Sequence, residues 1–171
     1  MCSLLQIYNL QEDTDKKDRE GTVLLHTWVL LHYKIPTEPT SRRVYVWRKL
    51  KRLGAVLLHD AVWVLPSTPS TQEQFQWLAA EIVEMGGDAL LWQAQLVSGA
   101  SEDELVQRFT AQVDAEYHEI LSDVEGHVPD LIALSRRYQQ TRLEDYFQSA
   151  LGRQARDALV EAREKVKEAF Q

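Results

Sequence analysis

The chain has 171 residues, of which 44% are hydrophobic, and its formal net charge is −7. That length and composition suit one sizeable domain or one domain with a long helical appendage. The single cysteine, Cys2, excludes a disulfide or a cysteine metal cluster within one chain, and no apolar run is long enough to cross a membrane. We therefore expect a cytoplasmic protein with no membrane partner.

The sequence divides into three segments. Residues 1–21 end in the charged stretch QEDTDKKDREG, which has no apolar periodicity, and are expected to form a disordered leader. Residues 22–98 alternate between strand-like and helix-like patterns. Residues 99–171 show helical patterns and are expected to form an extension of the domain.

The segment 22–98 predicts an α+β domain. Its order is β-α-β-β-α-β, that of a ferredoxin-like fold with a four-stranded antiparallel sheet and both helices on one face. Thr40 or Ser41 is expected to cap the first helix, and Gly54 to end it. The predicted elements are a strand within 22–36, a helix over 42–53, two strands within 55–66, a helix over 71–85 and a strand within 88–97.

The segment 99–171 predicts an antiparallel helical hairpin. It opens with Ser101 as a helix cap, is broken near Gly126 and Pro129, and is interrupted again near 149–152. Its stripe of apolar residues either packs within the chain or forms a coiled-coil-like contact between two copies. The stripe consists of Val106, Phe109, Val113, Tyr117, Ile120 and Val124.

The helix expected over 42–53 concentrates basic charge. Between Pro39 and His59 the chain has six of its nineteen Lys and Arg residues and no acid. At 100° per residue, Val46, Trp47, Leu50 and Leu53 share one arc. The opposite arc carries Arg42, Arg48, Lys49, Lys51 and Arg52. This basic arc is either a solvated helix face or a surface for a polyanion.

The first turn of this helix raises a second question. Arg43 projects into the apolar arc, so it either extends its head group to water or meets an acid such as Asp60 or Glu38. Arg42 and Arg43 also oppose the helix macrodipole, so we expect a compensating negative charge. Together with Lys34 they would form an oxyanion site, unless Glu38 neutralises them within the chain.

Enzyme chemistry is not expected. A ferredoxin-like metal nuclease needs an acid after the first strand to hold a divalent cation, and that region reads LLHYKIP. Asp114 and His118 lie one helical turn apart, but a solvated pair is favoured over a metal site. Because known catalytic motifs are also missing from the sequence, we expect no catalytic residues, no metal and no resident cofactor.

Three stretches carry a family resemblance. They are WVLLHYKIPTEPTSRRVYVWRKLKRLGAVLLHDAVWVLPSTPSTQEQFQWLAAEIVEMGGDALLW, DAEYHEIL and RRYQQTRLEDYFQSALG. The first closely resembles the N-terminal domain of the ChrB chromate-resistance regulator family, and more distantly the ferredoxin-like C-terminal domain of PaaX-type repressors. The other two resemble the helical continuation of the same ChrB region, so the resemblance runs from about residue 22 to at least residue 160.

The resemblance implies a cytoplasmic transcriptional regulator of chromate efflux genes that binds promoter DNA and responds to chromate. ChrB proteins usually continue into a second domain, which this sequence is expected to lack. In the leading hypothesis, Arg48, Lys49, Lys51 and Arg52 contact DNA phosphates, and the helix start at Arg42 and Arg43 receives a phosphate or chromate. The alternative is a dimerisation or partner-binding module that works with a separate chromate-resistance domain. A homodimer is expected because the sheet would leave edge strands unpaired.

Overall fold

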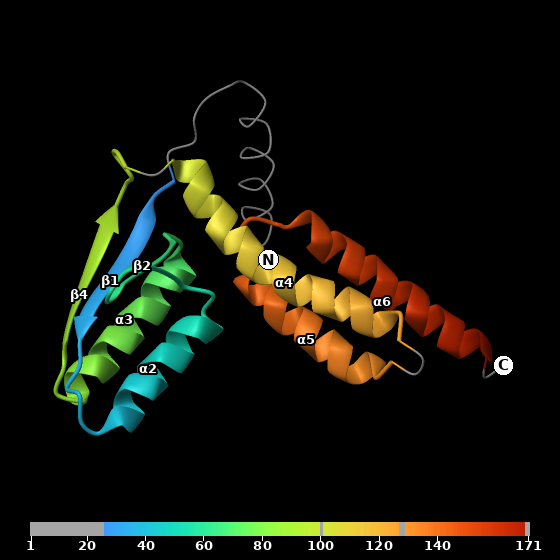
Figure 1. Cartoon of the computed structure of the whole chain (residues 1–171), viewed down its shortest axis with the longest axis horizontal. Coiled ribbons are helices and arrows are strands. Elements are labelled where there is room, and N and C mark those ends of the chain that lie inside the picture. Colours follow the sequence, from blue (N-terminus) through green and yellow to red (C-terminus); the bar gives the residue numbers. More distant parts are fainter. Residues whose placement is uncertain (1–25, 100, 127–128, 170–171) are drawn as a thin grey trace, which may run out of the picture.

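The computed structural model describes residues 26–99, 101–126 and 129–169, so the expected leader, 1–21, lies outside the described residues. These residues form an α+β structure with one four-stranded antiparallel sheet and five helices (Figure 1). The first part contains β1 (Trp28–Lys34), α2 (Thr40–Arg52), β2 (Val56–His59), β3 (Val62–Pro66), α3 (Pro69–Glu84) and β4 (Asp88–Ala94). The second part contains α4 (Glu102–Val124), α5 (Leu131–Glu144) and α6 (Ala150–Ala169).

The sheet has the strand order β2-β3-β1-β4, so β1 and β3 are central and β2 and β4 are edges. Leu31 pairs with Trp63 on one side and Leu91 on the other, and Leu31 and Trp63 are buried. Alternation along β1 places Val29, Leu31 and Tyr33 on one face. On that face α2 and α3 complete a core of buried aliphatic and aromatic side chains, including Val46, Leu50, Phe75, Leu78 and Ile82.

The start of α2 differs from the prediction. The helix begins at Thr40 with Pro39 as its N-cap residue, and no side chain caps it. Instead the carbonyl of Pro39 accepts a hydrogen bond from the amide of Arg42 at 3.1 Å. Thr40 and Ser41 therefore lie inside the helix, because the turn closes on the backbone before either hydroxyl is in the capping position.

The helical extension consists of three helices rather than the expected hairpin. Helices α4, α5 and α6 all pack against one another and lie side by side (Figure 1). The chain leaves the α5 helix at Asp145 because Tyr146 and Phe147 turn back to pack against the core of the sheet. The phenol of Tyr146 donates to the carbonyl of Leu53 at 2.7 Å, which ties this break to the end of α2.

The apolar stripe of α4 is used within the chain. Phe109 is buried in the core of the sheet, whereas Val113, Tyr117 and Ile120 are buried in a second core with α5 and α6. The alternative that the stripe packs internally is thus confirmed, and the stripe gives no support to a dimer. No helix in the described ranges is both long enough and apolar enough to pass through a bilayer.

Gly152 offers a test of the packing between α6 and α4. Exposed Gly→Ala changes in helices usually stabilise by about 0.5–1 kcal/mol. A Cβ at Gly152 would lie 2.9 Å from Cε2 of the buried Tyr117 ring, so we expect Gly152→Ala to lower the free energy of unfolding instead, by about 1–3 kcal/mol. Urea denaturation measures this change. An increase in stability would show that helix propensity outweighs the close approach.

Candidate functional site

The outer face of α2 carries exposed cations. Val46 and Leu50 are fully buried against the sheet, which turns the opposite side of the helix to solvent. Arg48, Lys51 and Arg52 lie on that side and are exposed. In the part of the chain that the structure describes, none of these three has a carboxylate oxygen within 4.0 Å. We call Arg48, Lys51 and Arg52 the outer basic face.

Lys49 does not belong to the outer basic face. Its Nζ contacts Oε1 and Oε2 of Glu81 on α3 at 2.5 and 2.7 Å, and the phenol of Tyr45 donates to the same carboxylate at 3.1 Å. The hydrogen bond to Glu81 raises the pKa of Lys49, so its ammonium is held charged between the two helices. Its charge is already balanced, which makes it less available to an external phosphate.

Arg42 and Arg43 point to different sides of α2. The Nη1 of Arg42 donates to the carbonyl of Met85 at 3.0 Å, and Met85 is the C-cap residue of α3. A cation at a helix C-terminus is favourable because it meets the negative end of the macrodipole. Arg42 is therefore directed toward α3, whereas Arg43 lines a cavity on the side of β2 and β3. The joint site expected from both arginines is not assembled.

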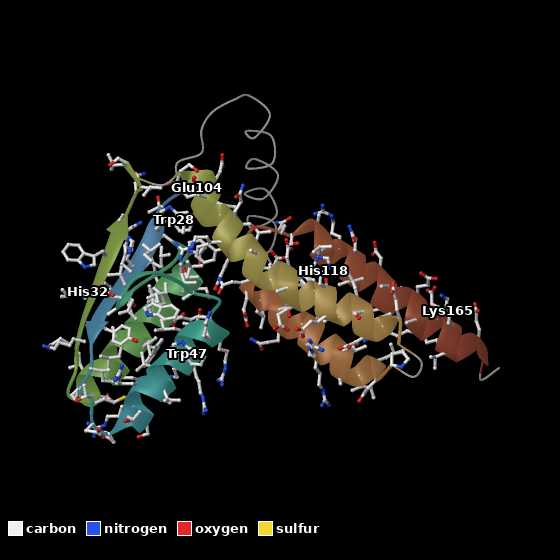
Figure 2. The ribbon with its side chains drawn as sticks, in the orientation of Figure 1. Trp28, His32, Trp47, Glu104, His118 and Lys165 are labelled. Carbon is white, nitrogen blue, oxygen red and sulfur yellow. The ribbon has the colours of Figure 1, made fainter. Side chains whose placement is uncertain are left out.

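The cavity beside Arg43 has a volume of about 660 Å³ and lies between α2 and the ends of β1 and the β2–β3 hairpin. Lys34 and Arg43 give it two cations, whereas Asp60 is the one acid among its lining residues. Tyr33, Trp47 and Trp63 supply aromatic walls, and Trp47 is 50% exposed. Figure 2 shows Trp47 on α2, close to the sheet. Such a cavity suits a small anion.

The state of Arg43 follows from its place at the cavity. Its side chain is exposed, and among the described residues it has no carboxylate partner within 4.0 Å, neither Asp60 nor Glu38. Of the two alternatives, the extended side chain with its head group in water is the one observed. Burial raises the pKa of Tyr33, against smaller opposing effects of Trp63 and Arg43, so the neighbouring phenol is neutral.

Trp77 is a candidate residue that the sequence reasoning missed. It lies on α3, is 66% exposed, and lines a groove of about 200 Å³ together with Gln74 of the same helix and Lys49 and Arg52 of α2. A helical projection of 69–84 places Trp77 on the flank of α3 rather than on the buried side with Phe75 and Leu78, and that was the signal available in the sequence. An exposed indole beside an arginine can stack on a base or another planar group.

Asp114 and His118, which the sequence places one helical turn apart on α4, have different surroundings. Asp114 accepts a hydrogen bond from the hydroxyl of Ser149, and His118 is exposed. Over residues 26–99, 101–126 and 129–169 no cluster of three potential metal ligands occurs.

A family model matches more than half of the chain. The family described as "Protein ChrB, N-terminal" matches residues 43–149, from the first turn of α2 to the residue before α6. The chain belongs to the ChrB N-terminal family. Protein ChrB of Cupriavidus metallidurans is 28% identical over 117 residues, which are 65% of this chain and 36% of that protein. The chain thus spans little more than a third of the curated relative it matches, and no solved structure matches it.

Arg43 can be separated from the core by mutation. Because Arg43 is exposed and lacks an acidic partner, Arg43→Ala should change the free energy of unfolding by less than about 0.5 kcal/mol. Leu50→Ala on the same helix is the control and should cost about 2–5 kcal/mol, since Leu50 is fully buried. Chemical denaturation of both variants checks this. A large loss for Arg43→Ala would mean that it makes a structural contact.

Proposed function

We propose that this chain is a chromate-resistance regulator module of the ChrB type that binds DNA through α2. The observation that carries the proposal is the outer basic face, three exposed cations on one helix in a chain whose net charge is −7. Three exposed cations without a carboxylate oxygen within 4.0 Å produce a local positive field despite the negative total. Family membership supports the connection with chromate resistance.

The outer basic face has the chemistry of a phosphate-binding surface. Arg48 and Arg52 lie one helical turn apart, and Lys51 lies between them in sequence, so all three can reach neighbouring phosphates. Phosphate contacts position a protein on DNA, whereas base contacts give sequence specificity. Trp77, which lies beside Arg52, could add stacking to this surface. We do not include Lys49 and Arg42 in this surface, because both side chains donate hydrogen bonds to α3 or its C-cap residue.

We assign the response to chromate, in this proposal, to the cavity lined by Lys34 and Arg43. Chromate is a tetrahedral dianion, and both cations can donate charge-assisted hydrogen bonds to its oxygens. Thr37 and Thr40 also line the cavity and add hydroxyl donors. Because the cavity shares α2 with the outer basic face, an anion bound there would lie next to the DNA-binding surface.

The fold in this proposal is ferredoxin-like. The succession β1-α2-β2-β3-α3-β4 and the antiparallel pairing support it. We also propose a cytoplasmic homodimer that assembles through β4. This edge strand exposes Leu90 and Trp92, at 53% and 57%, and His32 lies on the same face because it pairs with Leu90. Figure 2 shows His32 on the side of the sheet away from α2 and α3.

The DNA-binding surface can be tested by charge removal. The triple variant Arg48→Ala, Lys51→Ala and Arg52→Ala should bind the DNA upstream of the chain's own gene much more weakly. If each cation neutralises one phosphate, the slope of log K against log salt should become shallower by about 2.7 for each protomer that contacts the DNA. Fluorescence anisotropy over a salt series measures both quantities. The fold should be unchanged, because the three side chains are exposed.

A matched control removes three exposed cations elsewhere, by Arg136→Ala, Lys165→Ala and Lys167→Ala. It has the same net charge as the first variant and should keep most of the affinity and the slope. Equal losses in both variants would refute a specific surface on α2. The same assay with added chromate tests the effector proposal, since Lys34→Ala with Arg43→Ala should remove any effect of chromate on DNA affinity.

The proposed dimer predicts a mass near twice 19.8 kDa in sedimentation equilibrium at micromolar concentration. Leu90→Lys with Trp92→Lys should give monomers, because burying two ammonium groups at an apolar contact is costly. Trp77→Lys is the control, as Trp77 is equally exposed but lies on α3, and it should leave the dimer intact. A monomeric wild type, or dissociation by the control, would end the proposal for β4.

A further inference from the structure

A second cavity lies in the helical extension, where α4, α5 and α6 meet. Its volume is about 380 Å³, and its walls include Tyr117 of α4, Arg142 of α5, and Arg153 and Arg156 of α6. The interruption between α5 and α6 closes one side with Asp145 and Ser149. This cavity shares no lining residue with the cavity beside α2.

The charge of this second cavity is unbalanced. Three arginines line it, against one acid, Asp145, which leaves an excess of two positive charges. The Asp145 carboxylate already accepts from the phenol of Tyr117 at 3.2 Å and from the amide of Ser149 at 3.0 and 3.1 Å. Burial, and next the charge of Asp145, raise the pKa of Tyr117, so this phenol is a neutral donor to Asp145.

The three arginines lack carboxylate partners. In the described residues none of Arg142, Arg153 and Arg156 has a carboxylate oxygen within 4.0 Å. Only Arg153 makes a side-chain hydrogen bond there, a long one of 3.4 Å to the carbonyl of Gln148. Their guanidinium groups can therefore accommodate an anion without first breaking an ion pair.

Arg137, by contrast, does form ion pairs with nearby carboxylates. Arg137, also on α5, contacts carboxylates of Glu116, Glu119 and Asp123 at 3.5, 2.8 and 2.7 Å. Residues 101–171 contain fifteen acids against nine Lys and Arg, so acids are plentiful in this part of the chain. Arg142, Arg153 and Arg156 are exposed, and they line the cavity without such partners although acids are plentiful in this segment.

The start of α6 adds to the positive field. Ser149 precedes the helix, and its hydroxyl accepts from the amide of Leu151 at 3.1 Å. The first turn contains no acid, and Gly152 and Arg153 of that turn line the cavity. The positive end of the α6 macrodipole is thus directed at the same space as the three guanidinium groups.

We infer that this arginine cavity binds a tetrahedral dianion, either as a free oxyanion such as phosphate or as the terminal phosphate of a small ester. The charge excess of the walls equals the charge of the ligand, and guanidinium forks match the geometry of its oxygens. The volume leaves room for an organic group beside Tyr117 and Tyr138. This inference does not depend on DNA binding, because no residue of α2 takes part.

Isothermal titration of the full chain with inorganic phosphate, sulfate and glycerol phosphate tests the inference. Wild type should bind at least one of them with saturation, and Arg142→Gln and Arg153→Gln should each weaken that binding by about tenfold. Tighter binding of glycerol phosphate than of inorganic phosphate would identify an ester, and the reverse a free oxyanion.

Two controls keep the test specific. Arg136→Gln changes an exposed arginine of α5 outside the cavity, and Lys167→Gln changes an exposed lysine in the last turn of α6, also outside the cavity. Both should retain the binding measured for wild type. The inference is overturned if wild type binds none of the three anions at millimolar concentration, or if Arg136→Gln weakens binding as much as the cavity variants do. Ligand-dependent increases in the melting temperature give a second readout for variants of altered stability.

Discussion

The stacking of Trp28 on Phe109 joins the two halves of this protein. The two rings are nearly parallel, at 15°, and their centroids are 5.6 Å apart. Phe147 lies in the interruption between α5 and α6. Its ring centroid is 6.2 Å from that of Trp28 and 5.6 Å from that of Phe109. The indole nitrogen of Trp28 donates to Glu102 in the first turn of α4 at 3.2 Å. This aromatic cluster, Trp28, Phe109 and Phe147, fixes where α4 leaves the sheet and hence where the helical extension lies. Figure 2 shows Trp28 near the start of α4.

Because that junction is packed, the protein presents two cationic cavities and one basic helix on a single framework. Lys34 and Arg43 lie beside the sheet, whereas Arg142, Arg153 and Arg156 lie between the helices. Among the described residues these cations have no carboxylate oxygen within 4.0 Å although the chain is acidic overall, and in both places they are accompanied by tyrosine or tryptophan. Both proposals use the same chemistry, in which local cations attract a small anion that the total charge of the protein would repel.

The sequence was sufficient where a repeating pattern determines the structure. The 3.6-residue periodicity predicted that Val46 and Leu50 face the sheet and that Arg48, Lys51 and Arg52 face solvent, because one helix and one apolar layer fix that orientation. Turn residues and strand patterns likewise predicted the order of the elements up to β4. These features depend on contacts within a few residues along the chain.

The side-chain hydrogen bonds between elements that are distant in the sequence could not be predicted from such patterns. The bonds of Lys49 to Glu81 and of Arg42 to Met85 depend on α3 lying beside α2, which no pattern within 40–53 reports. The sequence patterns did not predict the arginine cavity, because Arg142 lies before the break between α5 and α6 whereas Arg153 and Arg156 lie after it. That break was expected near 149–152, but not that Tyr146 and Phe147 would turn back to the sheet and make a third helix.

The bond from Tyr146 to the carbonyl of Leu53 has a consequence for where this protein can be divided. Burial raises the pKa of Tyr146 to about 12, so this donor is retained at any physiological pH. Gly54, the next residue, has a φ of 65°, and a Cβ there would lie 2.9 Å from the Cβ of Glu144. A cut at residue 98 would therefore uncover the end of α2 as well as Trp28. The sheet and the three helices are thus joined both at the end of α2 and at Trp28, although the sequence reads as two separate segments.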